Sequence, residues 1–345
     1  MLMNSILERN LTLTKKLVVI DGAPGCGKTM LSSIIGSLNR VEILKYAYEI
    51  EHLCAQKYLN LIDEDTCENM IRIQLDLITY NIMMSRDVNF RLSDLSSVFN
   101  SSSPLKYILR ALRKGDEEVP DRITREDPIT HIATHGLLAL SEPLLKALGD
   151  KVLFIKFHRH PLYMIKQNTL NMQFLVNTSR HFTLYVKSNH KGPAVPFYAS
   201  TWADLFLSSN PKEKAIYYLQ WLRKEEIKFQ EINIFESILE LAFEFFVLNP
   251  YPQLEVVANA LKVSPAEFSK RIMRRERVPR VVYSAGRDIA IYRRVGWVPP
   301  TDGDLKKEMD VLKEYAISGV SKKARETVDW LCEEYESKVL SRVLL

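Results

Sequence analysis

Residues 22–29, which read GAPGCGKT, follow directly on the apolar run LVVI at positions 17–20. The eight residues satisfy G-x-x-x-x-G-K-[ST], the pattern of a phosphate-binding loop. Glycines let successive backbone N–H groups turn toward an anion, and a helix that begins where the loop ends adds its positive end. Three of the chain's 12 glycines fall in this loop, which favours a ligand site over a plain strand-to-helix turn. Lys28 is expected to contact outer phosphates, and Thr29 to hold Mg²⁺ if the nucleotide is ATP.

The composition is that of an ordinary globular protein. With 345 residues, 46% of them hydrophobic and 26% charged, the chain can bury a large core as one domain with a helical annex. The net charge of +5 suits an anionic ligand such as a nucleotide and is too small to indicate nucleic-acid binding. The four cysteines lack C-x-x-C spacing, which argues against a disulfide framework or a zinc site and favours a reducing compartment.

Nothing in the sequence indicates export or membrane insertion. The first 16 residues contain Glu8, Arg9 and several polar residues, so they do not resemble a signal peptide. No run approaches the 18 or more apolar residues of a membrane span. We therefore expect a cytoplasmic protein that does not associate with membranes.

Apolar runs alternate with helical patterns along the chain. Strands are predicted at 17–21, 41–45, 129–134, 152–157 and 237–243, and helices at 28–38, 49–59, 66–86, 142–148, 212–233, 250–261 and after Pro265. Helix 66–86 carries apolar residues nearly all round, which predicts a buried core helix. The alternation indicates an α/β P-loop fold of three layers, in which helices flank a parallel sheet. Because ligands bind outside the carboxyl ends of such strands, the loop at Gly22, the His135 region and the Arg159 region should meet in one crevice.

Two further segments lie outside this alternation. Residues 171–210 are irregular and rich in aromatic side chains, and they form either a cover over an acceptor pocket or a packed loop annex. Residues 301–345 are mostly amphipathic helix. The predicted organisation is a P-loop domain over 1–300 and a C-terminal helical extension over 301–345 that packs on the same domain.

Four segments resemble the sulfotransferase superfamily of P-loop proteins, in order and in spacing, across about 240 residues. Residues 22–31, GAPGCGKTML, are similar to its donor loop, G-x-P-[RK]-S-G-T-T-x-L. Residues 132–135, IATH, are similar to the K-T-H segment whose histidine is the family's general base. Residues 152–167, VLFIKFHRHPLYMIKQ, are similar to a strand followed by R-x-P-x-D-x-x-x-S, whose Arg and Ser bind the donor's 3′-phosphate. Residues 238–263 are similar to a strand, Y-E-D-L, N/D-P and a helix that ends in L-G.

The chain also departs from that family. Gly25 stands where the family has a basic residue, Lys28 where it has its first threonine, Ala133 where it has the lysine of K-T-H, and Gln167 where it has the serine. Lys28 and Thr29 restore the loop of kinases and NTPases, a kinase-like Walker A loop. The resemblance therefore implies 3′-phosphoadenosine 5′-phosphosulfate (PAPS) as donor, whereas the loop alone indicates ATP with Mg²⁺.

The resemblance assigns roles to individual residues. It implies that His135 is the catalytic base, and Lys28 is expected to stabilise charge on the departing oxygens. Arg159 either binds a phosphate or forms an ion pair at a helix start. The basic stretch 270–280 is either a solvated helix face or a nucleotide grip through Arg277 or Arg280. The predicted nucleotide-binding residues are Gly22, Ala23, Pro24, Gly25, Cys26, Gly27, Lys28, Thr29, Arg159, Gln167 and Arg277.

Three functions remain open at this point. The first is in-line transfer of a sulfuryl group from PAPS to a hydroxyl or amine of a small molecule. The second is an ATP/Mg²⁺-dependent small-molecule kinase on the same scaffold. This hypothesis is weaker because such enzymes have an acidic residue after a later apolar strand, and the nearest acidic residues here are Glu49 and Glu51. The third is a nucleotide-binding module without turnover. In each case the expected partners are small molecules, a nucleotide donor and, for the two enzymes, an acceptor.

Overall fold

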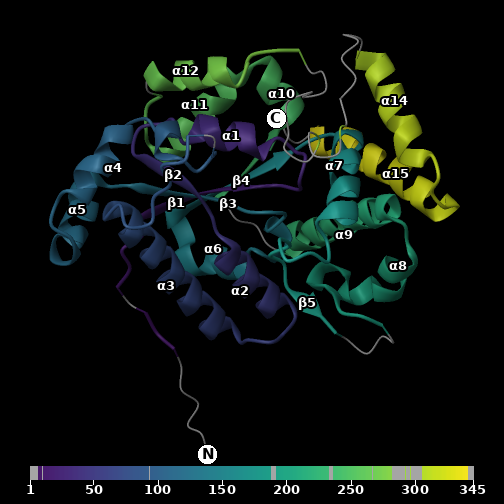
Figure 1. Cartoon of the computed structure of the whole chain (residues 1–345), viewed down its shortest axis with the longest axis horizontal. Coiled ribbons are helices and arrows are strands. Elements are labelled where there is room, and N and C mark those ends of the chain that lie inside the picture. Colours follow the sequence, from purple (N-terminus) through teal and green to yellow (C-terminus); the bar gives the residue numbers. More distant parts are fainter. Residues whose placement is uncertain are drawn as a thin grey trace, which may run out of the picture.

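A five-stranded parallel sheet forms the centre of the computed structural model (Figure 1), which describes residues 7–9, 11–92, 94–187, 192–232, 236–265, 267–281, 292, 296 and 305–340. The strand order is β2-β3-β1-β4-β7, and every neighbouring pair is parallel. The strands are β1 (Lys16–Asp21), β2 (Val41–Tyr46), β3 (Ile129–Ala133), β4 (Val152–His158) and β7 (Ile238–Ala242). The predicted strands and their parallel arrangement are thus confirmed.

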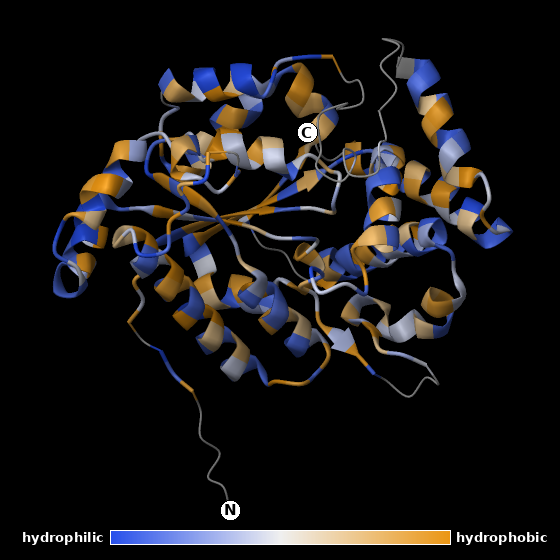
Figure 2. Ribbon diagram, viewed as in Figure 1, coloured by the Kyte–Doolittle hydropathy of each residue, from blue (hydrophilic) through white to orange (hydrophobic). Residues whose placement is uncertain are grey.

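Helices cover both faces of the sheet, which makes three layers. Side chains of α1, α11 and α12 join one buried cluster with the sheet, and those of α2, α3 and α6 join another on the opposite face. The bounds are α1 (Lys28–Ile35), α2 (Tyr48–Tyr58), α3 (Glu64–Met83), α6 (Glu142–Leu148), α11 (Pro250–Leu261) and α12 (Glu267–Arg275). Figure 2 shows the strands largely in the orange of apolar residues, as expected for a sheet buried on both faces. The α/β three-layer fold class is confirmed.

The prediction that helix α3 is buried all round is wrong. Ile73 and Leu77 are 39% and 48% exposed, because α3 packs one face against α2 and α6 and presents these residues to solvent. A polar residue takes a core position instead. The buried carboxylate of Asp76 accepts hydrogen bonds from the Arg9 guanidinium (Nε, 2.8 Å) and from the backbone N–H of Thr14 (2.9 Å).

A second helical group packs beside the sheet. Helices α7, α9, α14 and α15 share one buried cluster, so α14 and α15 lie against the same body as the P-loop. Their bounds are α7 (Pro161–Phe174), α9 (Pro211–Ile232), α14 (Leu305–Ile317) and α15 (Lys322–Glu334). The ends of the predicted extension, residues 301–304 and 341–345, lie outside the described residues.

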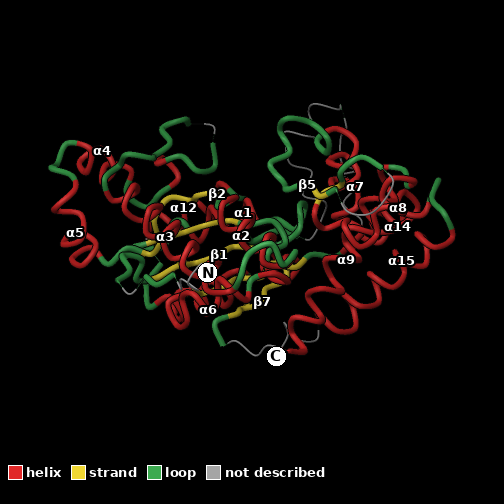
Figure 3. Tube along the Cα trace, turned by 90° about the horizontal axis from the view of Figure 1, so that it is seen from below, coloured by secondary structure: helices red, strands yellow, loops and turns green. Residues whose placement is uncertain are grey.

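The remaining elements are short. Among the described residues they are α4 (Pro104–Ala111), α5 (Val119–Glu126), α8 (Ala203–Ser208), α10 (Phe243–Leu248), the antiparallel pair β5 (Tyr185–Val186) and β6 (Val195–Pro196), five 3₁₀ helices and one π-helical turn (Tyr335–Val339). Helices α4 and α5 lie at one end of the molecule and α8, α14 and α15 at the other (Figure 3). Among the described residues, no helix has the length and apolar character needed to cross a membrane.

Candidate functional site

The phosphate-binding loop joins the buried end of β1 to the start of α1. Gly25 and Gly27 have φ angles of 94° and 98°, a backbone region that favours glycine. A Cβ atom on Gly27 would lie 2.6 Å from a ring carbon of Phe243, so no larger residue fits there. No side chain caps the first turn of α1. The local sequence therefore produces an anion cradle of backbone N–H groups at a helix start.

Lys28 and Thr29 occupy the first turn of α1. The Lys28 ammonium donates a hydrogen bond to the carbonyl oxygen of Gly22 (2.5 Å), so its positive charge lies over the loop. Thr29 is exposed. In the part of the chain that the structure describes, no group of three or more His, Cys, Asp and Glu residues is arranged to hold a metal ion.

A buried carboxylate ties three strand ends together. Asp21 accepts hydrogen bonds from the Thr134 hydroxyl (2.8 Å) and the Leu137 N–H (2.8 Å), and its other oxygen lies 3.3 Å from the Lys156 ammonium. Burial raises the pKa of Asp21, but the charges of Lys156 and Lys28 and these hydrogen bonds outweigh it and lower the pKa to about 2. Lys156 also pairs with Glu226 of α9. The ends of β1, β3 and β4 thus lie together, but Arg159 lines a different cavity from the one that His135 lines, so the prediction of a single crevice for all three regions is not met.

His135 follows β3 and is held by a carboxylate from α2. Glu51 Oε1 accepts hydrogen bonds from the His135 backbone N–H (3.1 Å) and from its Nδ1 (3.0 Å). A carboxylate accepts only from a protonated Nδ1, which leaves Nε2 as the proton acceptor of the ring. The ring of Tyr48 stacks on the imidazole at 5.6 Å and that of Tyr46 at 6.3 Å. These contacts fix both the tautomer and the plane of the ring.

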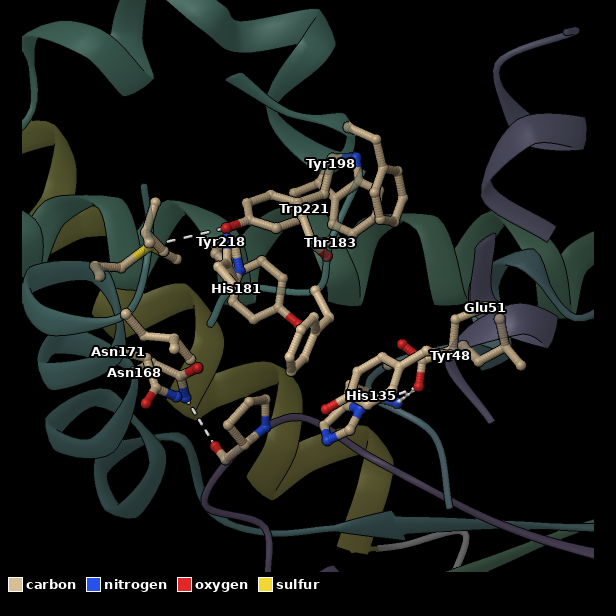
Figure 4. Close-up of a pocket in the computed structure, with 18 of the residues that line it drawn as sticks. Tyr48, Glu51, His135, Asn168, Asn171, His181, Thr183, Tyr198, Tyr218 and Trp221 are labelled. Atoms are coloured by element: carbon tan, nitrogen blue, oxygen red, sulfur yellow. Dashed lines mark hydrogen bonds and ion pairs between the residues drawn. The ribbon is translucent and has the colours of Figure 1, made fainter. Parts of the chain in front are cut away.

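The loop and His135 line the same cavity, whose volume is about 270 Å³. Pro24 contributes from the loop, His135 from the end of β3, and Asn168 and Asn171 from α7. Figure 4 shows His135 and Tyr48 on one side of this cavity and the two asparagines on the other. Its aromatic lining consists of Tyr48, Phe182, Phe197, Tyr198, Tyr218 and Trp221. Part of the wall, including Phe182, Phe197 and Tyr198, comes from segment 171–210, for which the sequence allows either a pocket cover or a packed loop annex.

Helix α7 and the residue two positions before it brace the loop. Arg159 is buried and donates from Nη1 to the carbonyl oxygen of Gly25 (3.0 Å), with its guanidinium 4.1 Å from the centre of the Phe243 ring. Its Nε has no hydrogen-bond partner among the described residues. Asn168 donates to the carbonyl oxygen of Pro24 (2.8 Å), and Gln167 Oε1 would lie 3.4 Å from a Cβ on Gly25. The structure thus brings Arg159 and Gln167 to the loop.

The structure does not bring the predicted nucleotide-binding residue Arg277 to the loop. Arg277 is exposed in the turn after α12, and no contact joins it to the loop within the described ranges. The Arg280 guanidinium lies 5.5 Å from the centre of the Phe243 ring, the same ring that Arg159 contacts. Arg280 is therefore the nearer of the two arginines to the loop. Residues 282–291, which follow, lie outside the described residues.

Sequence reasoning missed two residues of this site. The sequence offers Glu51 only as one of two acidic residues near the loop under the kinase hypothesis, and nothing in its surroundings along the chain indicates His135, which lies 84 residues away. Asn168 follows the predicted Gln167 directly. The signal that could have found it is the proline at position 161, which starts a helix and places positions 164, 167 and 168 on one face.

Solved structures that resemble the chain include three sulfotransferases. The sulfotransferase domain from the curacin biosynthetic pathway has a TM-score of 0.40 at 12% identity, covering 87% of this chain and 96% of that domain. The sulfotransferase domain of the Synechococcus PCC 7002 olefin synthase has a TM-score of 0.41 at 12% identity, covering 97% and 99%. A sulfotransferase from Mycobacterium avium has a TM-score of 0.37 at 12% identity, covering 77% and 68%.

No model of a known protein family matches the sequence, and no match is found among curated proteins. At 12% identity the likeness concerns the fold, and one fold hosts many chemistries. Function therefore has to come from the residues of the site.

Proposed function

We propose that this protein transfers a sulfuryl group from PAPS to a hydroxyl or amine of a small molecule. One observation carries the proposal: the His135 imidazole, with Nδ1 committed to Glu51, lines the same cavity as Pro24 of the phosphate-binding loop. A proton acceptor and an anion cradle are thus adjacent. Transfer of an oxygen-rich electrophile to a hydroxyl needs these two groups together.

The residues at the loop fit an anionic donor. The backbone of Gly25 and Gly27 adopts positive φ angles, as in loops whose N–H groups surround a phosphate. Arg159 is a buried cation beside Gly25, and its Nε hydrogen is unused among the described residues. Gln167 lies next to the same glycine. Loop amides, Lys28, Arg159 and Gln167 are therefore the groups that would hold PAPS, which supplies an activated sulfuryl group when bound.

Each side chain has a defined task in this mechanism. His135 Nε2 takes the proton of the acceptor hydroxyl, and the Glu51 carboxylate stabilises the imidazolium that forms. Lys28 carries its positive charge over the loop, where it stabilises negative charge that develops on the departing oxygens. Aromatic rings of the cavity exclude water and orient the acceptor. Cytoplasm is the proposed location.

A second candidate is an ATP/Mg²⁺-dependent kinase, favoured by the adjacent Lys28 and exposed Thr29 at the start of α1. The nearest carboxylate on the sheet, Asp21, already accepts hydrogen bonds from Thr134 and from two backbone N–H groups. A metal would have to compete with these donors, which favours the sulfuryl donor over ATP.

Isothermal titration calorimetry with adenosine 3′,5′-bisphosphate, and separately with ATP plus Mg²⁺, tests the donor. We expect tight binding of the bisphosphate that does not depend on Mg²⁺. Binding of ATP only with Mg²⁺, without binding of the bisphosphate, would favour the kinase and overturn the proposal. Bisphosphate binding without its release from PAPS across a panel of phenols and amines would indicate a binding module without turnover.

A further inference from the structure

We propose that the acceptor is a compact aromatic compound that carries an anionic group, and that Arg180 binds this group at the edge of the cavity. The inference rests on the proposed function and specifies the class of its acceptor. It depends on three properties of the cavity: the charges that line it, the rigidity of the segment that carries Arg180, and the shape of the enclosed space.

The uncompensated charge of the cavity lining is positive. Its charged side chains in the described structure are Glu51 and Arg180, and Glu51 is committed to His135. Arg180 is exposed, and its guanidinium makes no hydrogen bond or ion pair with any described residue. Burial lowers the pKa of His181, which keeps that imidazole neutral near pH 7. An anion that enters the cavity therefore finds a free guanidinium and no free carboxylate opposing it.

The rim segment, residues 177–185, is fixed in position by hydrogen bonds. The Tyr185 hydroxyl accepts a hydrogen bond from the backbone N–H of Asn177 (2.8 Å) and lies 2.7 Å from His181 Nδ1. His52 Nε2 donates to the carbonyl oxygen of Phe182 (2.7 Å). Arg180 lies between these anchors. Because the backbone of this segment is already held, binding a ligand orders the Arg180 side chain but not the segment that carries it.

The ring of Tyr48 lies between the rim segment and the catalytic base, His135. The Phe182 ring packs edge-on against Tyr48 at 5.6 Å, and Tyr48 stacks on His135 at 5.6 Å. A small aromatic molecule can therefore present its hydroxyl to His135 and its other end toward Arg180. The volume of about 270 Å³ is just below the range of about 300–1,000 Å³ for ligand pockets, which favours a single-ring compound.

The chemistry of the anionic group follows from the guanidinium. A planar fork of N–H donors matches a carboxylate, sulfonate or phosphate through two parallel hydrogen bonds. An exposed ion pair of this kind gives a modest advantage, on the order of fivefold in affinity, and it weakens as salt is added. The expected effect is therefore a preference among acceptors and not an absolute requirement.

Binding can be measured without any donor. The fluorescence of Trp221, which lines the cavity, reports titrations with 4-hydroxyphenylacetate, 4-ethylphenol and tyramine, which share a phenol ring and differ in charge. We expect the anion to bind tightest, about fivefold over the neutral phenol, and tyramine weakest. Arg180→Gln should remove the preference and Arg180→Lys should keep part of it. The matched control is Arg113→Gln, at an exposed position after α4.

Two results would overturn the anion site: tyramine binding as tightly as 4-hydroxyphenylacetate, or an unchanged preference in Arg180→Gln. Comparing kcat/KM for the three phenols, with PAPS as donor, separates this inference from the proposed function. Transfer to all three phenols with equal kcat/KM would show that the anion site is wrong and that the protein is still a sulfotransferase. If the anionic phenol binds tightest but none of the three accepts a sulfuryl group from PAPS, the proposed function is wrong and the anion site is supported.

Discussion

Glu51 and His135 are 84 residues apart and meet through one atom, Glu51 Oε1, which accepts hydrogen bonds from both the backbone N–H and the Nδ1 of His135. The double contact holds the ring and the main chain that carries it. Because one carboxylate oxygen sets the position of the base, catalysis should depend on Glu51 as well as on His135.

Replacing His135 by Ala removes the proton acceptor. General base catalysis typically contributes about 10²–10⁴ in rate, so kcat/KM with PAPS and a phenol should fall by that factor. Affinity for adenosine 3′,5′-bisphosphate should stay within about twofold, because the donor is held by the loop and not by the imidazole. Turnover that is undiminished in His135→Ala under a saturating donor would show that another group takes the proton.

Glu51→Gln keeps the shape of the side chain and removes its charge. The imidazolium that forms during transfer then lacks its counter-charge, and we expect kcat to fall about 10- to 100-fold with little change in the KM of either substrate. A matched control is Glu49→Gln, because Glu49 is exposed on the same helix. If both variants lose the same activity, the loss comes from α2 as a whole and the positioning role is wrong.

Gly25→Ala tests the anion cradle. At a φ of 94° a side chain is strained, and the new Cβ would lie 3.2 Å from the Cα of Met164, so the loop must shift away from α7. Affinity for adenosine 3′,5′-bisphosphate should fall at least tenfold. Gly149→Ala serves as the control, since Gly149 also has a positive φ, 58°, with open space around a Cβ. With ψ at −125°, Gly149 lies outside the left-handed helical region, so that variant should lose about 1–3 kcal/mol of stability and bind the bisphosphate normally.

The sheet and the loop could be predicted because their signals are local. Each strand is a short apolar run next to a turn or a helical pattern, and the glycine pattern at 22–27 marks the first crossover. The observed strands begin and end within one or two residues of the predicted ones. Parallel pairing then follows from alternation with helices, and with it the meeting of Gly22, His135 and Arg159 at one edge.

The contacts that complete the site could not be predicted, since they join distant positions by complementary charge. Nothing near Glu51 in the chain distinguishes it from Glu49, and only the packing of α2 beside β3 brings it to His135. The sequence pattern does not predict α7, because this helix is enclosed by the loop, α9 and α14. It therefore buries residues on several faces, including the polar Asn168 and Thr169, and shows no single apolar stripe.

Asp21 should make the stability of the protein depend on pH. Its pKa is lowered from 3.8 to about 2 in the folded state. A lowered pKa means that the unfolded chain binds the proton more tightly, so the carboxylate stabilises the fold above about pH 4 and loses this effect as the pH falls from 4 toward 2. The difference in pKa corresponds to about 2 kcal/mol.

Asp21→Asn removes the charge that faces Lys156, and breaking a buried pair of this kind costs about 3 kcal/mol at pH 7. Urea unfolding of both proteins at pH 7 and at pH 3 measures the effect, and the difference in unfolding free energy should shrink by about 1 kcal/mol at pH 3. The exposed Asp150 provides the control, because Asp150→Asn should change stability by less than about 0.5 kcal/mol at either pH. A gap between wild type and Asp21→Asn that is the same at both pH values would mean that Asp21 stabilises the fold through its shape and hydrogen bonds and not through its charge.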